Sequence, residues 1–328
     1  MKAFVAGGTG FIGSHIVRDL LAKGIQVRVL VRERHTDRRL QKERGMEWVR
    51  GDVLEKESLQ KWTKDVDLVF SAFGVLGGWR IPEKAYWDIN FKGVQNLMQS
   101  CLHTNIKQFI HLSSAGVLGP LSNGVKADES YPFNPSNIYE ETKCEAEKEI
   151  MKYGARYAFP FTIIRPEFVY GPGDTHVLGL FQALAERRFA FMGKGESLLH
   201  PTYIDDLIEG ISLCTDNEKA LGEIFLIAGG RPLEVKEFVG IMAEEMDVPL
   251  PKIRIPLFIA HAAARMWQFL ARSTRSEPPI TVSRVKFFSQ NRAFSIEKAR
   301  EVLGYTPKIS FREGVRRTVH WYRQNHYM

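Results

Sequence analysis

The chain has 328 residues, of which 44% are hydrophobic, and this length allows one large buried core or two moderate ones. Lysine and arginine number 45 against 38 aspartates and glutamates, which gives a net charge of +7. No repeat or low-complexity segment is present, and no uncharged apolar run is long enough to span a bilayer. The first residues form an apolar run without a charged leader. We therefore expect a soluble, cytoplasmic enzyme.

A glycine-rich turn, GGTGFIG, covers Gly7–Gly13 and follows the apolar run Ala3–Ala6. The apolar residues after it recur at helical spacing, so the pattern predicts a strand, a tight turn and a helix. In such a unit one glycine permits the turn, one lets the backbone approach a pyrophosphate, and one lets the helix pack on the strand. We therefore predict a dinucleotide site, to which the turn contributes Gly7, Gly8, Gly10, Phe11, Ile12 and Gly13.

The second predicted strand, Gln26–Val31, is followed by Arg32, Glu33 and Arg34. An acidic residue at this place binds the ribose hydroxyls of NAD, whereas an arginine accommodates the 2′-phosphate of NADP. Arg32, with Arg34 as a helper, therefore favours NADP(H). Glu33 turned toward a ribose leaves NAD(H) as an alternative, and solvated surface charges are a third interpretation.

Strand and helix patterns alternate through the first half of the chain. The predicted strands are Trp48–Arg50, Val66–Ser71 and Gln108–Leu112, and the predicted helices are Glu55–Trp62 and Tyr86–His103. This alternation predicts an α/β fold with a Rossmann-type, doubly wound parallel sheet. We expect residues 1–165 to form the dinucleotide-binding domain, with a return of the chain near 203–228. Residues 166–328 are expected to form mainly a smaller substrate-binding region.

Ligands of such sheets gather at the carboxyl ends of the strands. There we expect Asp52 and Val53 to flank an adenine, and Ala72, with Phe73 and Gly74, to follow the fourth strand and line the cofactor. Asp52 has an alternative role as a helix cap, because an aspartate at a strand end often starts the next helix.

Tyr139 and Lys143 lie four residues apart in a predicted helix, Ile138–Lys152, so that their side chains project from one face. A nearby ammonium stabilises a phenolate, and we expect it to lower the pKa of Tyr139 so that this residue exchanges protons nearer neutral pH. Ser113 and Ser114 follow the fifth strand, and a hydroxyl there can hold a substrate oxygen beside Tyr139. These residues form a candidate catalytic set, and a solvated helix pair is the other interpretation.

The chain has three cysteines, Cys101, Cys144 and Cys214, without the spacing of a metal site or the pairs of a disulfide framework. This usage suits a reducing compartment, and we expect unreactive thiols and no metal. The basic residues are not accompanied by a recognised nucleic-acid module, so we expect no nucleic-acid partner.

In its motifs the chain resembles the extended short-chain dehydrogenase/reductase family, nearly from end to end. The matching segments are Gly7–Gly13, Gly51–Val53, Asp88–Asn96, His111–Gly119, Tyr139–Lys143, Ile163–Asp174 and His200–Leu207. The resemblance implies that Tyr139 is the general acid/base and that Ser114 is the catalytic serine. It also implies that Lys143 binds the nicotinamide ribose while tuning Tyr139, and that Asn90 supports the site from the fourth helix.

Within that family, the segment Pro278–Tyr322 is most similar to the 3β-hydroxysteroid dehydrogenase and sterol-4-carboxylate 3-dehydrogenase branch. Ala115 and Gly116 stand where dehydratases carry an Asp-Glu pair, so the extra acid and base for water elimination are missing. Phe168 stands where nucleotide-sugar enzymes often carry an asparagine, and phenylalanine cannot donate a hydrogen bond to a phosphate. Phe168 suits an apolar ligand.

Residues 252–292 contain eight Lys or Arg, Arg292 among them, and one acid. The net charge of this segment therefore equals the +7 of the whole chain. Within this stretch, 257–272 carries its polar residues on one narrow helical stripe and apolar residues at nearly every other position. Because this apolar arc is wider than one core contact needs, we expect it to line an apolar pocket, meet another subunit, or make peripheral contact with a membrane. A well-buried helix is the alternative.

The sequence thus predicts an NADP(H)-preferring oxidoreductase that interconverts a ketone and a secondary alcohol on a hydrophobic sterol-, isoprenoid- or acyl-like substrate. Two alternatives stay open: a nucleotide-sugar epimerase with bound NAD, and a non-catalytic NADPH-binding subunit or sensor. The family often dimerises through helices such as Tyr86–His103 and Ile138–Lys152, so we expect a homodimer.

Overall fold

The centre of the computed structural model, which describes residues 1–32, 43, 45–78, 80–273 and 277–328, is a seven-stranded parallel sheet. Its strands are β1 (Lys2–Ala6), β2 (Gln26–Val31), β3 (Met46–Arg50), β4 (Leu68–Ser71), β5 (Gln108–Leu112), β6 (Phe161–Pro166) and β11 (Glu223–Ile227). β2 and β5 have the predicted bounds. The starts of β1, β3 and β4 differ from the prediction by one or two residues.

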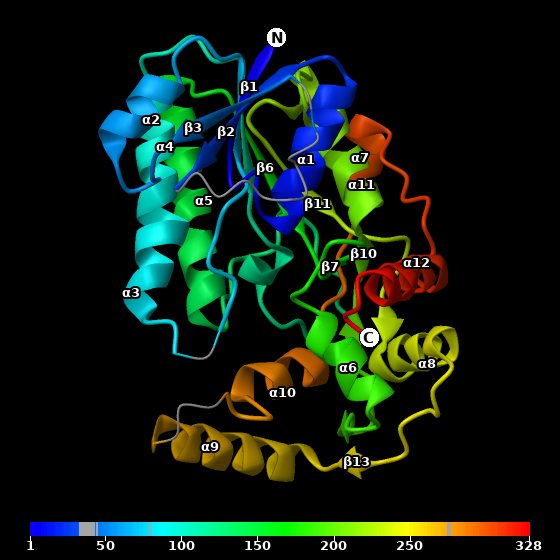
Figure 1. Ribbon diagram of the computed structural model, residues 1–328. Coiled ribbons are helices and arrows are strands. Elements are labelled where there is room, and N and C mark those ends of the chain that lie inside the picture. The colour runs from blue at the N-terminus through cyan, green and yellow to red at the C-terminus, as the bar shows by residue number, and fades with distance from the viewer. Residues whose placement is uncertain (33–42, 44, 79, 274–276) are drawn as a thin grey trace.

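The strand order, β11-β6-β5-β4-β1-β2-β3, places a switch point between β1 and β4, where the chain changes the direction in which it adds strands. Helices α2, α4 and α5 cover one face of the sheet, and α1, α7 and α11 cover the other (Figure 1). These helices are α1 (Phe11–Ala22), α2 (Lys56–Trp62), α4 (Val94–Cys101), α5 (Ile138–Tyr157), α7 (Ile204–Cys214) and α11 (Glu297–Leu303). The predicted doubly wound α/β fold is confirmed.

The helix α5 carries the candidate catalytic tyrosine and lysine and extends five residues beyond its predicted end. It begins after Asn137, whose side-chain oxygen accepts a hydrogen bond from the amide of Glu140 at 3.0 Å. It ends at Ala158, which adopts the left-handed conformation (φ 50°) that often terminates helices.

The predicted helix Tyr86–His103 is built from three successive parts, α3 (Glu83–Tyr86), a π-helical segment η1 (Trp87–Gly93), and α4. π-Helical turns are rare and frequently lie at functional sites. Asn90 is a buried residue of this segment.

Beyond β6 the chain builds a second layer below the carboxyl ends of the strands (Figure 1). Its two-stranded sheets pair β7 (Val169–Tyr170) with β10 (Thr202–Tyr203), β8 (Phe191–Met192) with β13 (Arg254–Ile255), and β9 (Leu198–Leu199) with β12 (Leu233–Glu234). Its helices are α6 (Leu178–Ala185), α8 (Val235–Met246), α9 (Leu257–Ser273), α10 (Val282–Ser289) and α12 (Phe311–Gln324). In between, α7, a 3-10 turn (Glu218–Ala220) and β11 return to the central sheet. The domain boundary at residue 165 stays a prediction.

The helix α9 packs on its neighbours through small side chains. Ala260, Ala264 and Ala271 are buried, whereas Phe258 is 75% exposed and Phe269 is 68% exposed. The alternative that this stretch is a well-buried helix is therefore wrong.

No helix in the part of the chain that the structure describes is long and apolar enough to cross a membrane.

The three cysteines are buried, and burial raises the pKa of the Cys101 and Cys214 thiols to about 12. Within the described ranges, no three His, Cys, Asp or Glu side chains are grouped so that they could hold a metal ion. The buried thiols therefore have the protonation state of unreactive cysteines.

Substituting Gly13 tests the close packing of the first turn. A Cβ at Gly13 would lie 2.0 Å from the carbonyl oxygen of Gly7, whereas a Cβ at Gly240 in α8 meets no atom within 4 Å. Because the obstacle is backbone, we expect Gly13→Ala to lower the free energy of unfolding by about 1–3 kcal/mol. The matched change Gly240→Ala should leave it unchanged or raise it by about 0.5–1 kcal/mol. Urea denaturation measures the free energy of unfolding of both variants. Equal values for the two variants would contradict the close packing of Gly13 against Gly7.

Candidate active site

The glycine-rich turn joins the end of β1 to the start of α1 and touches the end of β4. Gly7 has a φ of +89°, and a Cβ on it would lie 2.5 Å from the carbonyl oxygen of Ala72. The amide of Gly10 donates to the carbonyl oxygen of Gly7 at 2.9 Å and closes the turn. Phe11 and Ile12 then open α1, whose first amides have no side-chain cap in this structure. The turn therefore leaves backbone N–H groups at the switch point of the sheet, where a pyrophosphate fits.

The residues predicted to contact the adenosine half lie after β2 and β3. Arg32 is exposed at the end of β2, and Glu33 and Arg34 lie outside the described residues. Asp52 uses its side chain locally, since Oδ1 accepts a hydrogen bond from the amide of Leu54 at 2.9 Å. The carbonyl oxygen of Val53 accepts from Asn96 at 3.0 Å, which holds this loop against α4. This bond closes a local turn before α2, whose N-cap is Glu55, so Asp52 does not cap the helix. The adenine contact stays a prediction.

Ser114 and Tyr139 meet at the carboxyl end of β5. Ser114 caps a short 3-10 turn (Ala115–Leu118), and its Oγ accepts a hydrogen bond from the amide of Gly116 at 3.0 Å. The same hydroxyl lies close enough to the phenol of Tyr139 to act against the rise of its pKa. The structure therefore brings together the serine and the tyrosine that the sequence paired.

Lys143 is buried one helical turn beyond Tyr139. Its Nζ donates to the carbonyl oxygen of Leu112 at 2.8 Å and lies 3.5 Å from that of Phe73. Burial lowers the pKa of Lys143 to about 8. The expected lowering of the Tyr139 pKa by Lys143 is not found: burial raises the pKa of Tyr139, and the nearby hydroxyl of Ser114 opposes this rise only in part. The physical reason is that desolvation disfavours the phenolate more than its neighbours favour it.

Asn90 connects the π-helical segment to both sides of the site. Its Oδ1 accepts from the amide of Val75 at 2.7 Å, and its Nδ2 donates to the carbonyl oxygen of Val75 and to Oγ1 of Thr142, both at 3.1 Å. The loop after β4 is thereby fixed against α5, next to Lys143. A Cβ on Gly74 would lie 3.5 Å from the ammonium of that lysine. Asn90 thus has the geometry of a supporting residue.

Two buried polar atoms near the carboxyl end of β5 have no hydrogen-bond partner within the described residues, Oγ of Ser113 and Nε2 of His111. The other ring nitrogen of His111 lies 3.1 Å from the hydroxyl of Ser71. Unpartnered buried groups of this kind are costly unless a ligand or water completes them. Together with the backbone cradle of Gly7 and Gly13, they fit a dinucleotide that extends along this edge of the sheet.

Sequence reasoning missed a buried ion-pair cluster beside Tyr139. Nε of Arg292 lies 2.6 Å from Oε1 of Glu167, and Nη1 lies 3.3 Å from Oε1 of Glu140. Glu140 also accepts from the amide and the hydroxyl of Ser136, each at 2.8 Å. Arg292 is therefore not part of the basic surface to which its segment was assigned. No local pattern marks the three residues, because they come from separate parts of the chain.

Phe168 stands at the position where nucleotide-sugar enzymes often carry an asparagine. It lies in an aromatic cluster next to this ion-pair cluster. Its ring centroid is 5.4 Å from those of Phe238 and Phe287 and 6.5 Å from that of Tyr170. The guanidinium of Arg292 lies 5.5 Å from the ring of Phe287. The wall beside Tyr139 is therefore largely apolar, with its charges paired behind it.

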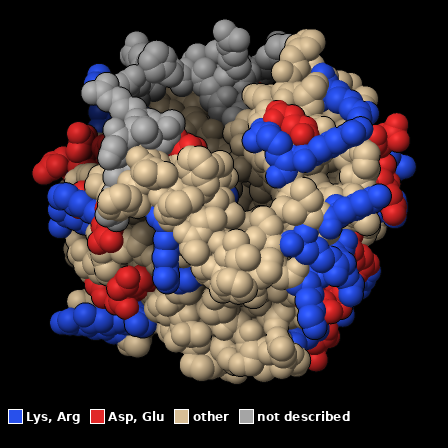
Figure 2. Space-filling model, turned by 90° about the horizontal axis from the view of Figure 1, so that it is seen from below, with Lys and Arg blue, Asp and Glu red and all other residues tan. Residues whose placement is uncertain are grey.

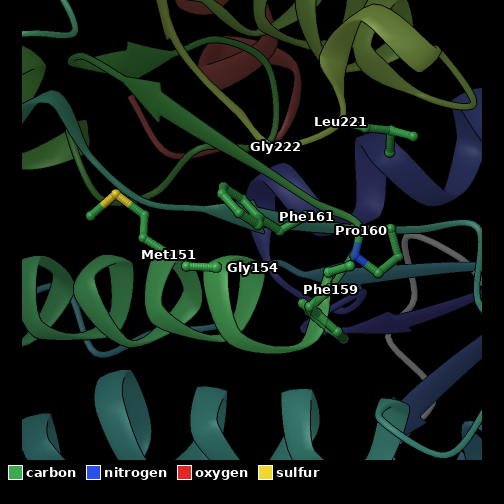
Figure 3. A pocket seen from close by; sticks show the side chains of 9 residues that line it. Met151, Gly154, Phe159, Pro160, Phe161, Leu221 and Gly222 are labelled. Carbon is green, nitrogen blue, oxygen red and sulfur yellow. The ribbon is translucent and has the colours of Figure 1, made fainter.

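A surface hollow of about 490 Å³ lies at the amino ends of the strands, where β6 begins, opposite to the candidate site (Figure 3). Its lining consists of Met151, Gly154, Ala155, Ala158, Phe159, Pro160, Phe161, Leu221 and Gly222. None of these side chains can exchange a proton or bind an anion. The hollow is therefore not the candidate site.

Residues 3–228, which include the glycine turn and the set of Ser114, Tyr139 and Lys143, match the NAD dependent epimerase/dehydratase family. The chain belongs to this family. Its membership confirms the resemblance inferred from the motifs, and the dinucleotide that the turn fits is accordingly a nicotinamide cofactor.

Individual members of the family extend the comparison over the whole chain. A 4-hydroxy-2-methyl-3-oxo-4-farnesyl-3,4-dihydroquinoline-1-oxide ketoreductase from Stigmatella aurantiaca is 26% identical and aligns with 96% of this chain and 95% of its own length. A decarboxylating sterol-4-alpha-carboxylate 3-dehydrogenase from Schizosaccharomyces pombe is 26% identical, with 98% and 97% aligned. The solved structure of UDP-glucuronic acid 4-epimerase from Bacillus cereus is 23% identical, covers 99% of both chains and has a TM-score of 0.80, which shows the shared fold.

The lowered pKa of Lys143 predicts a pH-dependent stability difference. Because the folded-state pKa of about 8 lies below the ordinary value of 10.5, the unfolded chain binds more protons between these pH values. Wild type should therefore gain stability relative to Lys143→Met as pH rises through this window, by about 1 kcal/mol per pH unit. Urea denaturation of both proteins at several pH values measures the difference, in which the titration of the cysteines cancels. A constant difference would show that Lys143 is not desolvated.

Proposed function

We propose that the protein is an oxidoreductase that interconverts a ketone and a secondary alcohol on a hydrophobic substrate, with NADP(H) as the preferred cofactor. The observation that carries this proposal is the proximity of Ser114 to Tyr139 at the carboxyl end of β5, beside the aromatic wall of Phe168. A nicotinamide ring, when bound, supplies or accepts the hydride. The side chains of this protein have to position the substrate oxygen and move its proton.

Tyr139 is the group assigned to the proton. In ketone reduction its O–H donates the proton to the carbonyl oxygen as the carbonyl carbon becomes a carbinol carbon, and in the reverse direction the phenolate takes the proton back. Burial, which raises the pKa of Tyr139, keeps the phenol protonated and suits donation. Ser114 is fixed by the amide of Gly116, so its hydroxyl is directed toward the same oxygen. Lys143 is assigned to the nicotinamide ribose.

The substrate is assigned as hydrophobic from the surroundings of Phe168. Three aromatic rings surround it, and the hydroxyl of Tyr170, the donor among them, is directed at the carbonyl oxygen of Phe311. Apolar ligands are bound in pockets lined by such side chains. The names of the two relatives agree, since one acts on a farnesyl-bearing ketone and the other on a sterol.

The preference for NADP(H) rests on Arg32, and its substitution tests that preference. We expect Arg32→Ala to weaken NADPH binding about 10-fold to 100-fold, because a hydrogen bond to a charged group contributes about 1.5–3 kcal/mol. NADH binding should stay unchanged. Titration calorimetry with both cofactors measures the ratio, and Arg156→Ala, at the far end of α5, is the control. Equal losses for the two cofactors would remove Arg32 from the phosphate site.

The activity itself is tested with Tyr139→Phe and a panel of apolar ketones. We expect wild type to oxidise NADPH in the presence of an apolar ketone, and we expect the variant to lose a factor of about 10²–10⁴ in kcat because general acid catalysis is removed. NADPH binding by the variant should persist. Absorbance at the nicotinamide band follows the reaction.

A UDP-sugar in the same panel separates the alternatives. Sugar conversion without added cofactor would contradict the assignment of a hydrophobic substrate and favour an epimerase. NADPH-dependent ketone turnover that survives in Tyr139→Phe would remove Tyr139 from the reaction.

A further inference from the structure

The outer face of α9 is an apolar surface of unusual composition. Among the described residues, sixteen large apolar side chains are exposed, and nine of them lie within 250–270. They are Leu250, Ile253, Leu257, Phe258, Ile259, Met266, Trp267, Phe269 and Leu270. Single exposed apolar residues need no explanation, but a contiguous group marks an interaction surface.

The helical spacing makes this surface a continuous stripe. At 100° per residue, Phe258, Ile259, Met266, Phe269 and Leu270 fall within an arc of about 120°. The buried alanines of α9 lie on the opposite side. An ordinary surface helix buries its large apolar side chains and exposes small or polar ones. The reversed arrangement leaves the aromatic face of α9 without a partner in the described chain.

Positive charge borders the stripe. Lys252, Arg254 and Arg265 are exposed, and residues 250–270 contain no acid. None of the three basic residues forms an ion pair with a carboxylate of the described residues, whereas Arg284 on α10 pairs with Glu277 at 3.0 Å. Seen from below, the side on which α9 lies, the middle of the surface is largely free of charged side chains, and charged side chains of both signs lie toward its left and right edges (Figure 2). An apolar stripe with unpaired basic residues is complementary to an anionic lipid surface.

The position of α9 connects this surface with the candidate site. The loop after β4 starts beside Lys143 and reaches α9, where Nη2 of Arg80 donates to the carbonyl oxygen of Ala271 at 3.3 Å. A second copy of the chain is a poorer occupant, because a two-fold contact places the same patch against itself and offers no acid to the basic residues.

We propose that α9, with the segment 250–256 before it, docks on the surface of a lipid bilayer that contains anionic phospholipid. The phenylalanines of the stripe enter the boundary between headgroups and acyl chains, and Lys252, Arg254 and Arg265 meet the headgroup phosphates. This docking does not depend on the proposed enzymatic activity.

Sedimentation with vesicles tests the docking on the full chain. We expect the protein to bind phosphatidylcholine vesicles that contain phosphatidylglycerol more tightly than vesicles of phosphatidylcholine alone, with the difference reduced by salt. Phe258→Ser combined with Phe269→Ser should weaken the partition at least tenfold, because two exposed aromatic anchors are removed. Phe258→Leu combined with Phe269→Leu should retain most of it.

The matched control is Tyr157→Ser combined with Leu221→Ser, two exposed apolar residues at the opposite edge of the sheet, and we expect no change in partition. Arg254→Gln and Arg265→Gln should each weaken binding about fivefold, and only on the anionic vesicles. Absence of binding to both vesicle types would overturn the proposal. A loss of vesicle binding in the control variant equal to that in the phenylalanine-to-serine variant would also overturn it. A dimer in analytical ultracentrifugation that the serine variants dissociate would overturn it in favour of a second copy.

Discussion

The packing around the candidate site depends on one buried cation, Arg292, held between Glu167 and Glu140. Removing one partner of such a cluster leaves an uncompensated buried charge and costs about 3–5 kcal/mol. Glu140 follows Tyr139 on α5, Glu167 precedes Phe168 after β6, and Arg292 follows α10. The cluster therefore fixes the candidate catalytic helix, the apolar wall and the C-terminal segment against one another, although they are far apart in the sequence.

The same burial decides the electrostatics of the site. It raises the pKa of Tyr139 and lowers those of Lys143 and His111, so each of these groups is shifted toward its neutral form. The carboxylates of Glu140 and Glu167 add to the rise at Tyr139, and Arg292 opposes it. Two carboxylates against one guanidinium leave a surplus of negative potential, which disfavours a phenolate. The structure therefore favours the protonated form of Tyr139, whereas the Tyr-Lys spacing alone predicted a lowered pKa.

How far the sequence predicts this molecule depends on whether a feature is local. The strands β2 and β5, the glycine turn and the start of α5 follow from alternation and spacing, and all are found where the sequence places them. The choice of Ser114 over Ser113 as the partner of Tyr139 needed the family resemblance, since both hydroxyls follow the same strand. The cluster of Arg292 could not be predicted, because a buried arginine and a surface arginine look alike in a sequence. The π-helical segment around Asn90 likewise leaves no periodic signal.

α9 shows a different limit. Its wide apolar arc was visible in the sequence, but alanine and phenylalanine are both apolar, so the pattern does not say which of them packs inward. The fold decides this through α10, a helix of eight residues. Val285 of α10 is buried against Ala260 and Ala264, where only small side chains of α9 allow the two helices to approach.

Two residues after Val285, on the other side of α10, Phe287 lies 5.4 Å from Phe168 in the wall of the candidate site. One short helix therefore has α9 on one side and the aromatic wall on the other. Close packing transmits a displacement from one neighbour to the next, because such a core has few voids to absorb it. If the outer face of α9 meets a bilayer, the aromatic wall lies one helix away from it. That arrangement suits a substrate of low water solubility, since its apolar surface leaves water in the membrane before it reaches the protein.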